Sequence, residues 1–330
     1  MLEWSVSEPF SLFDCRFYLA EPDQGKREYG LDHIPGAHYL HLNQDLSGEI
    51  GDGSRGRHPL PDVKALWTTL FSMGVTEDSK IVCYDSSGGP YASRLWWLLR
   101  HSGFTDIWVL DGGWQAWLAY LEENPHVART ALNQNDHSTG SDTSLSSMTL
   151  APSTQEAGDA KDARDAKEAG EAGEAGEAGE AGEAGEAVRS GGAATASSNT
   201  KNSPVLVSVE AIETQLDHMN LVDSRTHDRF LGQNETIDPV AGHIPGASNL
   251  SWLDNLSVSG HFLDAEVLKS RFAPVFEKSG PPVFYCGSGV TACHNILATQ
   301  VAGLPMPSLY AESWSGWISR SNRPVKQGEE

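Results

Sequence analysis

The sequence predicts an α/β protein in which one domain is built twice. Three observations support this prediction: two stretches repeat each other's motifs in the same order, each alternates short apolar strands with amphipathic helices, and a segment of different composition separates them. Such alternation is typical of a mainly parallel sheet with helices on both faces. A chain of 330 residues, 39% of them hydrophobic, is long enough for two domain cores and a connector.

The internal repeat has a period of about 200 to 210 residues. Its clearest motif, His-Ile-Pro-Gly-Ala, occupies residues 33–37 and again 243–247. Further matches keep the same order along the chain: 14–16 with 223–225, 82–85 with 283–286, and Trp114 and Trp117 with Trp314 and Trp317. A preserved order indicates a duplication. We therefore expect an N-terminal domain over residues 1–122 and a C-terminal domain over residues 204–330.

Each copy contains the expected alternation of elements. In the first copy, apolar residues recur at helical spacing: Val63, Leu66, Trp67, Leu70 and Phe71. Residues 80–85 and 107–111 are predicted as strands, with a helix from about 91 to 102 between them. In the second copy a strand is expected to end at Cys286. One apolar face of the helix that follows is marked by Cys293, Ile296, Leu297 and Val301.

Residues 123–203 form the segment of different composition. It contains no aromatic residue, is rich in Ala, Gly, Ser, Asp and Glu, and settles into Glu-Ala-Gly repeats from 168 to 187. Such a stretch buries too little apolar surface to offset its ordering entropy, and each glycine weakens a helix by about 1 kcal/mol. We expect a disordered acidic linker that serves as a solvated spacer, with a partner-binding tail as the less favoured alternative.

The formal net charge of −22 and a pI near 4.8 oppose two classes of partner. Nucleic acids and anionic membranes bind clustered Lys and Arg, so neither is expected. No apolar run approaches the ~18 residues of a membrane span, and the first residues lack a signal pattern, so a cytoplasmic protein is expected. Four cysteines without Cys-x2-Cys spacing predict free thiols rather than disulfides or a zinc site.

The loop from Cys286 to Thr291, Cys-Gly-Ser-Gly-Val-Thr, carries the strongest chemical signal. In open parallel sheets, ligands bind at the carboxyl ends of strands, where Cys286 is predicted to lie. Gly287 and Gly289 allow the loop to curl so that its N–H groups point inward, beside the N-terminus of the next helix. Such a cradle favours a thiolate, and equally the terminal sulfur of a persulfide. We therefore predict that Cys286 is the nucleophile.

The other cysteines and the matching loop of the first copy have a different interpretation. Cys15, Cys83 and Cys293 are expected to be small buried hydrophobes. Asp85 stands where the second copy has Cys286, followed by Ser-Ser-Gly-Gly. Because a carboxylate there cannot carry sulfur, the first domain is expected to be inactive in transfer and to shape the cleft or pack against the second.

These motifs resemble the tandem-domain rhodanese and 3-mercaptopyruvate sulfurtransferase family, over nearly all of the chain outside the linker. The resemblance implies that both domains share one α/β fold, that only the C-terminal domain carries the cysteine, and that the active site lies between the domains. Family members with Cys-Gly-Ser-Gly look like mercaptopyruvate enzymes, whereas members with Arg and Lys after the cysteine look like thiosulfate enzymes. The loop therefore favours 3-mercaptopyruvate as the donor, with thiosulfate as a second donor.

The resemblance also assigns roles to individual residues. Arg229 matches the arginine that holds the substrate carboxylate, and a guanidinium can clamp a carboxylate through two parallel hydrogen bonds. Ser288 matches the loop serine that works with a first-domain histidine, here His58. The position that matches the family's acid reads Asn43, with Asp45 two residues further on as the candidate acid. The substrate-binding set is completed by the loop residues Gly287, Gly289, Val290 and Thr291.

Several other residues are candidates for a role in the site or in the core. His33 and His243 begin Pro-Gly turns and are expected to be structural. Trp314 and Trp317 either wall the cleft or pack in the core. Mercaptopyruvate enzymes often carry a second arginine before Gly-His-Ile-Pro-Gly, and this chain has none there. Three first-domain arginines are candidates to replace it: Arg55, Arg57 and Arg94.

The expected reaction is ping-pong. The Cys286 thiolate attacks the donor sulfur, and the resulting persulfide passes sulfur to cyanide, a small thiol or a reduced thioredoxin-like protein, with no metal or organic cofactor. A Cys-dependent phosphatase is disfavoured, because it would need Cys-x5-Arg and the sixth residue after Cys286 is Ala292. A non-enzymatic persulfide carrier would have nearly the same sequence and differs only in lacking turnover with small donors.

Overall fold

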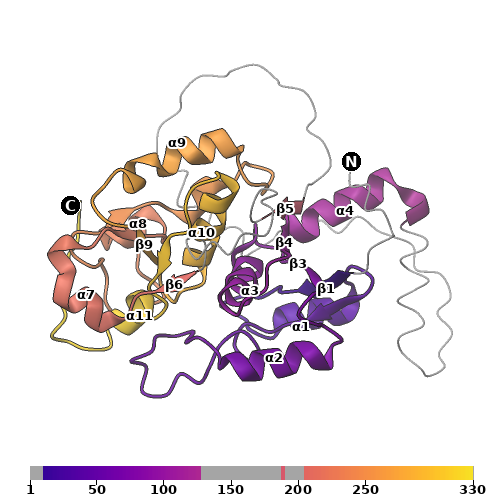
Figure 1. Ribbon diagram of the computed structural model, residues 1–330, viewed down its shortest axis with the longest axis horizontal. Helices are drawn as coiled ribbons and strands as arrows, with labels where there is room; N and C mark the ends of the chain where they lie inside the picture. The colour runs from indigo at the N-terminus through magenta and orange to yellow at the C-terminus, as the bar shows by residue number, and fades with distance from the viewer. Residues whose placement is uncertain (1–9, 128–186, 190–203, 330) are drawn as a thin grey trace.

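A computed structural model describes residues 10–127, 187–189 and 204–329 of the chain. Most of the expected linker, including nearly all of its Glu-Ala-Gly repeats, lies outside the described residues. The described residues form two α/β domains that lie side by side (Figure 1). None of the helices in these ranges has the length and apolar character needed to cross a membrane.

The first domain is built on a five-stranded sheet of order β2-β1-β3-β4-β5. Its strands are β1 (Phe10–Asp14), β2 (Ala37–Tyr39), β3 (Lys80–Tyr84), β4 (Ile107–Leu110) and β5 (Ala187–Arg189). The first four are parallel, and β5 pairs with β4 in the antiparallel sense. The helices are α1 (Gln24–Leu31), α2 (Val63–Ser72), α3 (Pro90–His101) and α4 (Gly113–Glu123). The predicted strands and helices of the first copy are all present at these positions.

The second domain repeats this plan with the order β8-β7-β9-β10-β6, all parallel. Its strands are β6 (Val205–Leu206), β7 (Leu221–Asp223), β8 (Ser248–Asn249), β9 (Val283–Tyr285) and β10 (Ser308–Leu309). Its helices are α7 (Val209–Gln215), α8 (His227–Leu231), α9 (Ala265–Phe276), α10 (Thr291–Val301) and α11 (Ser313–Trp317), with 3-10 turns η3 (Leu216–His218) and η4 (Trp252–Asn255). Four strands correspond in order between the two sheets, which confirms the predicted α/β duplication.

Two of the described parts of the expected linker contain regular structure. Helix α4 continues through Glu123, and residues 187–189 form β5 at the edge of the first sheet. An edge strand such as β4 presents unpaired N–H and C=O groups, and a passing segment can satisfy them through main-chain hydrogen bonds. Composition alone does not reveal such pairing, because it depends on the backbone of another strand.

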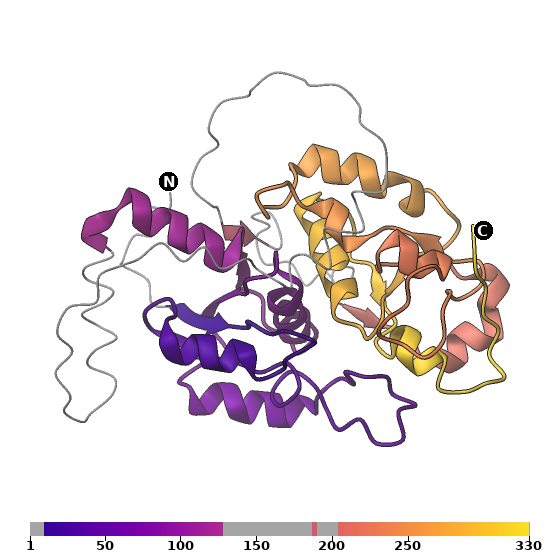
Figure 2. The same ribbon diagram turned by 180° about the vertical axis from the view of Figure 1, so that it is seen from behind.

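Helices α3 and α10 pack against each other where the two domains meet (Figures 1 and 2). The sequence predicted one apolar face for α10, but residues 292–300 are buried all around the helix. The reason is that α10 lies between its own sheet and α3 of the other domain. Its polar residues find partners there; His294, for example, has its Nε2 atom 3.0 Å from the carbonyl oxygen of Gly88 in the first domain.

The two His-Ile-Pro-Gly motifs form matching turns. Gly36 and Gly246 adopt φ angles of 81° and 80°, a left-handed conformation that favours glycine. His33 and His243 each place Nδ1 within hydrogen-bond distance of a backbone carbonyl oxygen in the preceding helix. Each imidazole also stacks on an aromatic ring of that helix, Tyr29 on α1 and Phe230 on α8. These contacts are the kind expected of residues that hold a turn in place.

Candidate active site

Cys286 directly follows β9 and lies at the carboxyl end of the second sheet. Cys286 is only 2% exposed to solvent. The backbone N–H of Gly289 donates to the Cys286 sulfur at 3.1 Å, so the loop curls back on the thiol as predicted. Gly289 has a φ of +78°, and a Cβ atom there would lie 2.4 Å from the carbonyl oxygen of Ala311. Only glycine allows this turn, which directs an N–H dipole at the sulfur.

Ser313, at the start of α11, supports the same loop. Its hydroxyl oxygen accepts the Cys286 N–H at 3.1 Å and donates to the carbonyl oxygen of Tyr310 at 3.0 Å. Ser313 is the one non-glycine residue with a positive φ, 55°, in the part of the chain that the structure describes. Such a backbone conformation costs free energy and often occurs at functional sites.

The matching loop of the first domain, residues 85–92, binds a carboxylate through its backbone N–H groups. The buried carboxylate of Asp85 accepts four backbone N–H groups at 2.8 to 3.0 Å, from Ser87, Gly89, Tyr91 and Ala92. Burial raises the pKa of Asp85, and the four N–H donors oppose that rise. The loop is therefore an anion nest that the first domain fills with its own side chain. In the second domain the same position carries the Cys286 sulfur.

His58 reaches the Cys286 loop from the first domain. Its Nδ1 atom lies 2.7 Å from the hydroxyl oxygen of Ser288, and both side chains are buried. Burial, together with the positive charges of Arg57 and Arg94, lowers the pKa of His58 to about 3. The imidazole is therefore neutral near pH 7, and a neutral imidazole can accept the Ser288 proton.

Arg94, on α3, links the backbone at His58 to the Cys286 loop. Its fully buried guanidinium donates to the carbonyl oxygens of Gly289 (3.1 Å), His58 (3.0 Å) and Pro59 (3.2 Å). Within the described ranges it forms no ion pair with a carboxylate, and burial lowers its pKa while the thiols of Cys293 and Cys286 oppose that. A buried cation without a carboxylate partner stabilises negative charge on a nearby sulfur.

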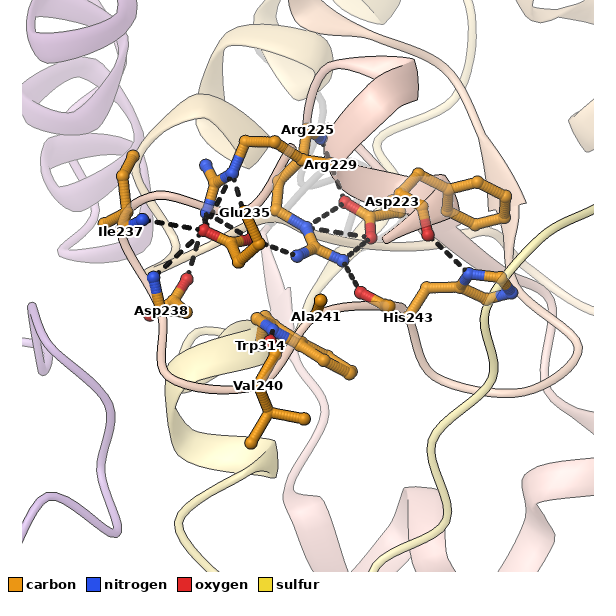
Figure 3. A network of polar contacts seen from close by, with 12 residues as sticks. Asp223, Arg225, Arg229, Glu235, Ile237, Asp238, Val240, Ala241, His243 and Trp314 are labelled. Atoms are coloured by element: carbon orange, nitrogen blue, oxygen red, sulfur yellow. Dashed lines mark hydrogen bonds and ion pairs between the residues drawn. The ribbon is translucent and has the colours of Figure 1, made fainter. Parts of the chain in front are cut away.

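Arg229 and Arg57 face the loop from the two domains. A Cβ atom on Gly287 would lie 3.1 Å from Nη2 of Arg57 and 3.6 Å from Nη2 of Arg229. Arg229 pairs with Glu235 at 2.8 Å and with Asp238 at 3.0 Å, as Figure 3 shows. Arg57 pairs with the other oxygen of Asp238 at 2.5 Å. The absence of a side chain at Gly287 leaves room in front of both guanidiniums.

The three candidate first-domain arginines thus occupy different places. Arg57 lies at the loop beside Arg229, and its backbone N–H donates to the Ser315 hydroxyl at 3.0 Å. Arg94 is committed to backbone carbonyls, and Arg55 is exposed and donates to the carbonyl oxygen of Leu60. Of the three, Arg57 is the one whose guanidinium lies beside Gly287 and Arg229.

Some expected site residues lie elsewhere. The carboxylate of Asp45 accepts the His41 N–H at 2.7 Å, and among the described residues no hydrogen bond joins it to His58. Trp314 and Trp317 are fully buried core residues, whose indole N–H groups donate to the carbonyl oxygens of Val240 and Pro324. They pack in the core and do not wall the cleft.

Sequence reasoning missed Glu235 and Asp238, which pair with Arg229. They belong to the loop between α8 and the second His-Ile-Pro-Gly turn. The available signal was the charge pattern, because two acidic residues follow an arginine assigned to an anionic substrate. Of the two remaining predicted loop residues, Val290 is buried, and Thr291 is half-buried and begins α10.

Comparison with known proteins agrees with this fold. The Rhodanese-like domain model matches residues 3–120 and again 208–320. The chain therefore belongs to the rhodanese family and contains two copies of its domain. Within that family it is a sulfurtransferase, as its relatives are.

Two curated relatives and one solved structure illustrate the similarity. A probable 3-mercaptopyruvate sulfurtransferase of Pseudomonas aeruginosa is 39% identical, over 98% of this chain and 95% of that protein. A mouse thiosulfate sulfurtransferase is 26% identical, over 96% of this chain and 89% of that protein. The structure of a 3-mercaptopyruvate sulfurtransferase from Leishmania major superposes with a TM-score of 0.62 at 25% identity, covering 93% of this chain and 69% of that one.

Proposed function

We propose that this sulfurtransferase moves sulfane sulfur from 3-mercaptopyruvate, through a persulfide on Cys286, to a thiol or to cyanide. The observation that carries the proposal is the position of the Cys286 sulfur, which accepts the Gly289 N–H in a loop faced by Arg229 and Arg57. A carboxylate bound by these guanidiniums would have its sulfur-bearing end beside the nucleophile. The 39% identity to a probable 3-mercaptopyruvate sulfurtransferase supports the same donor.

The first half-reaction conserves atoms and charge. The Cys286 thiolate forms a bond to the donor sulfur, the donor's carbon–sulfur bond breaks, and its electron pair leaves on the enolate of pyruvate. The donor's thiol proton then passes to the enolate carbon, which yields pyruvate and an anionic persulfide. Ser288, with its hydroxyl donating to the neutral Nδ1 of His58, is positioned to relay this proton.

The second half-reaction returns the enzyme to its starting state. An acceptor thiolate or cyanide bonds to the outer sulfur of the persulfide, and the sulfur–sulfur bond breaks to release the Cys286 thiolate. The N–H of Gly289 and the buried charge of Arg94 stabilise the anionic sulfur in both states. A small thiol or a reduced thioredoxin-like protein is the proposed acceptor, and the four free cysteines are in keeping with a reducing, cytoplasmic compartment.

Residues 1–122 are proposed as the silent domain and 204–330 as the catalytic one. Asp85 fills the first-domain nest with a carboxylate that occupies four backbone N–H donors, and a carboxylate cannot carry sulfur. The silent domain nevertheless supplies His58, Arg57 and Arg94 to the proposed site.

The proposed function is tested by kcat/KM for 3-mercaptopyruvate and thiosulfate, measured side by side with cyanide as acceptor. The expected result is turnover with both donors and a preference for 3-mercaptopyruvate. Thiosulfate is retained as the second donor because a mouse thiosulfate sulfurtransferase aligns over 96% of this chain. A strong thiosulfate preference would overturn the donor assignment. Loading by a partner protein without turnover of either small donor would instead identify a persulfide carrier.

A further inference from the structure

Asp238 places a carboxylate of the protein itself at the proposed donor site. Its side chain is only 2% exposed, with one oxygen 2.5 Å from Arg57 Nη1 and the other 3.0 Å from Arg229 Nη2. That second oxygen lies 3.6 Å from where a Cβ atom on Gly287 would be. A carboxylate of the chain is thus held between one guanidinium from each domain, directly beside the catalytic loop.

Asp238 belongs to a network of ion pairs with equal numbers of cations and carboxylates, and Figure 3 shows its second-domain members. Arg225 pairs with Asp223 and Glu235, Arg229 pairs with Glu235 and Asp238, and Arg57 pairs with Asp238. Three cations therefore face three carboxylates. Arg94 lies outside this network and donates to backbone carbonyl oxygens, including that of Gly289. The network offers hydrogen-bond donors to an anion, but it carries no net positive charge.

Asp238 is held in place more firmly than its ion-pair partner Arg57. Its backbone N–H donates to Glu235 at 2.9 Å, and Pro239 follows it in the chain. The Arg57 side chain is 26% exposed, and Asp238 is its ion-pair partner among the described residues. An arriving anion can therefore bind by drawing Arg57 away from Asp238, whereas Arg229 stays clamped by two carboxylates.

We propose that Asp238 is a specificity-determining residue, whose charge makes the site favour a donor with one negative charge over a donor with two. The proposal rests on the proposed function, since it concerns the choice between two sulfur donors. 3-Mercaptopyruvate with its thiol protonated is a monoanion, and thiosulfate is a dianion. The Coulomb repulsion by a fixed negative charge doubles when the charge of the donor doubles.

The size of the effect follows from the separation of the charges. For charges about 6 Å apart at a dielectric between those of a protein surface and water, removing Asp238's charge changes binding by about tenfold per unit of donor charge. The variant Asp238→Asn keeps the shape and one acceptor oxygen but removes the charge. Its ratio of kcat/KM for thiosulfate to that for 3-mercaptopyruvate should therefore rise by about tenfold.

Two matched variants separate this effect from a general disturbance. Asp238→Glu keeps the charge and should keep a ratio near that of the wild type. Asp254→Asn removes a carboxylate from an exposed position of the same domain, near Arg271, and should leave the ratio unchanged. A ratio for Asp238→Asn within twofold of the wild type, at an unchanged melting temperature, would refute the proposal. An equal rise in Asp238→Glu would refute it as well.

A second measurement needs neither sulfur donor. The rates at which anionic iodoacetate and neutral iodoacetamide alkylate Cys286 are measured by peptide mass spectrometry. The ratio of the two rates reports the electrostatic potential at the sulfur, because the fraction of thiolate affects both rates equally. The ratio should rise by about tenfold in Asp238→Asn, or in Asp238→Ser if the first variant does not fold. An unchanged ratio would overturn the role of Asp238. Failure of the wild type to use either donor would instead overturn the proposed function and leave this readout intact.

Discussion

The Nδ1 atom of His58 and the hydroxyl oxygen of Ser288 lie 2.7 Å apart, although 230 residues separate them in the chain. One belongs to the domain without a sulfur-carrying cysteine and the other to the loop of Cys286. Under the proposed function, the contact gives a reason to retain the first domain, because the proposed proton relay is complete only when the two domains are packed together. Arg94 strengthens the same junction by donating to carbonyl groups of both domains.

Replacing His58 should separate the two donors. In His58→Phe, kcat with 3-mercaptopyruvate should fall by about a hundredfold, because the enolate carbon must receive a proton. Thiosulfate turnover should change much less, since sulfite leaves without protonation at carbon. Steady-state kinetics with both donors measures this difference, and His218→Phe, at an exposed position, serves as the control. Equal losses for both donors would mean that His58 acts only by holding the domains together.

Asp85 should matter for folding rather than for transfer. Asp85→Asn leaves one oxygen where two accept four backbone N–H groups, so buried donors lose their partner, at a cost of about 2 to 4 kcal/mol. Urea denaturation should show this loss, while kcat per folded molecule stays near the wild-type value. Asp78→Asn, at an exposed position, is the matched control. A stability equal to that of the control would show that the nest does not need its anion.

Stability should fall as the solution is acidified. Burial lowers the pKa of both His58 and His294 to about 3, so in the folded protein neither imidazole takes up a proton near pH 6. Unfolded histidine binds its proton below about pH 6.5. Because the unfolded state binds more protons between about pH 6.5 and 3, acidification favours unfolding over that window. Each histidine should lower the free energy of unfolding by roughly 2 kcal/mol between pH 6.5 and 5.

Urea midpoints at pH 7, 6 and 5 measure this dependence. The variant His58→Phe removes one of the two histidines, so its loss of stability with acidification should be visibly shallower than that of the wild type. A wild-type midpoint that does not move between pH 7 and 5 would be inconsistent with two buried neutral histidines at the domain junction.

Local sequence was sufficient to predict the strands and helices and the curled shape of the Cys286 loop. The positions of Gly287 and Gly289 after a short apolar strand predict a curled loop, and the structure shows the Gly289 N–H directed at the Cys286 sulfur. The duplicated motifs predict two copies of one α/β domain, since each copy contains its own strands and turns, and the two sheets share the order of four strands. These features depend on residues that are close to one another in the chain.

Features that depend on the packing of the two domains could not be predicted from the sequence. The sequence offered three first-domain arginines, and only the docking of the loop 54–58 on α11 places Arg57 in front of Gly287. The burial of α10 on all sides has the same origin. Asp238 lies in a loop without a periodic pattern, so its approach to both arginines had no sequence signature beyond its charge.

The most direct test of the central claim is the mass of the intact protein after brief exposure to 3-mercaptopyruvate. The wild type should gain the mass of one sulfur atom, and cyanide should remove it. Cys286→Ser should gain nothing, whereas Cys293→Ser, at a buried position seven residues later on α10, should still be loaded. A sulfur gain in Cys286→Ser, or no gain in the wild type, would contradict the assignment of Cys286 as the sulfur carrier.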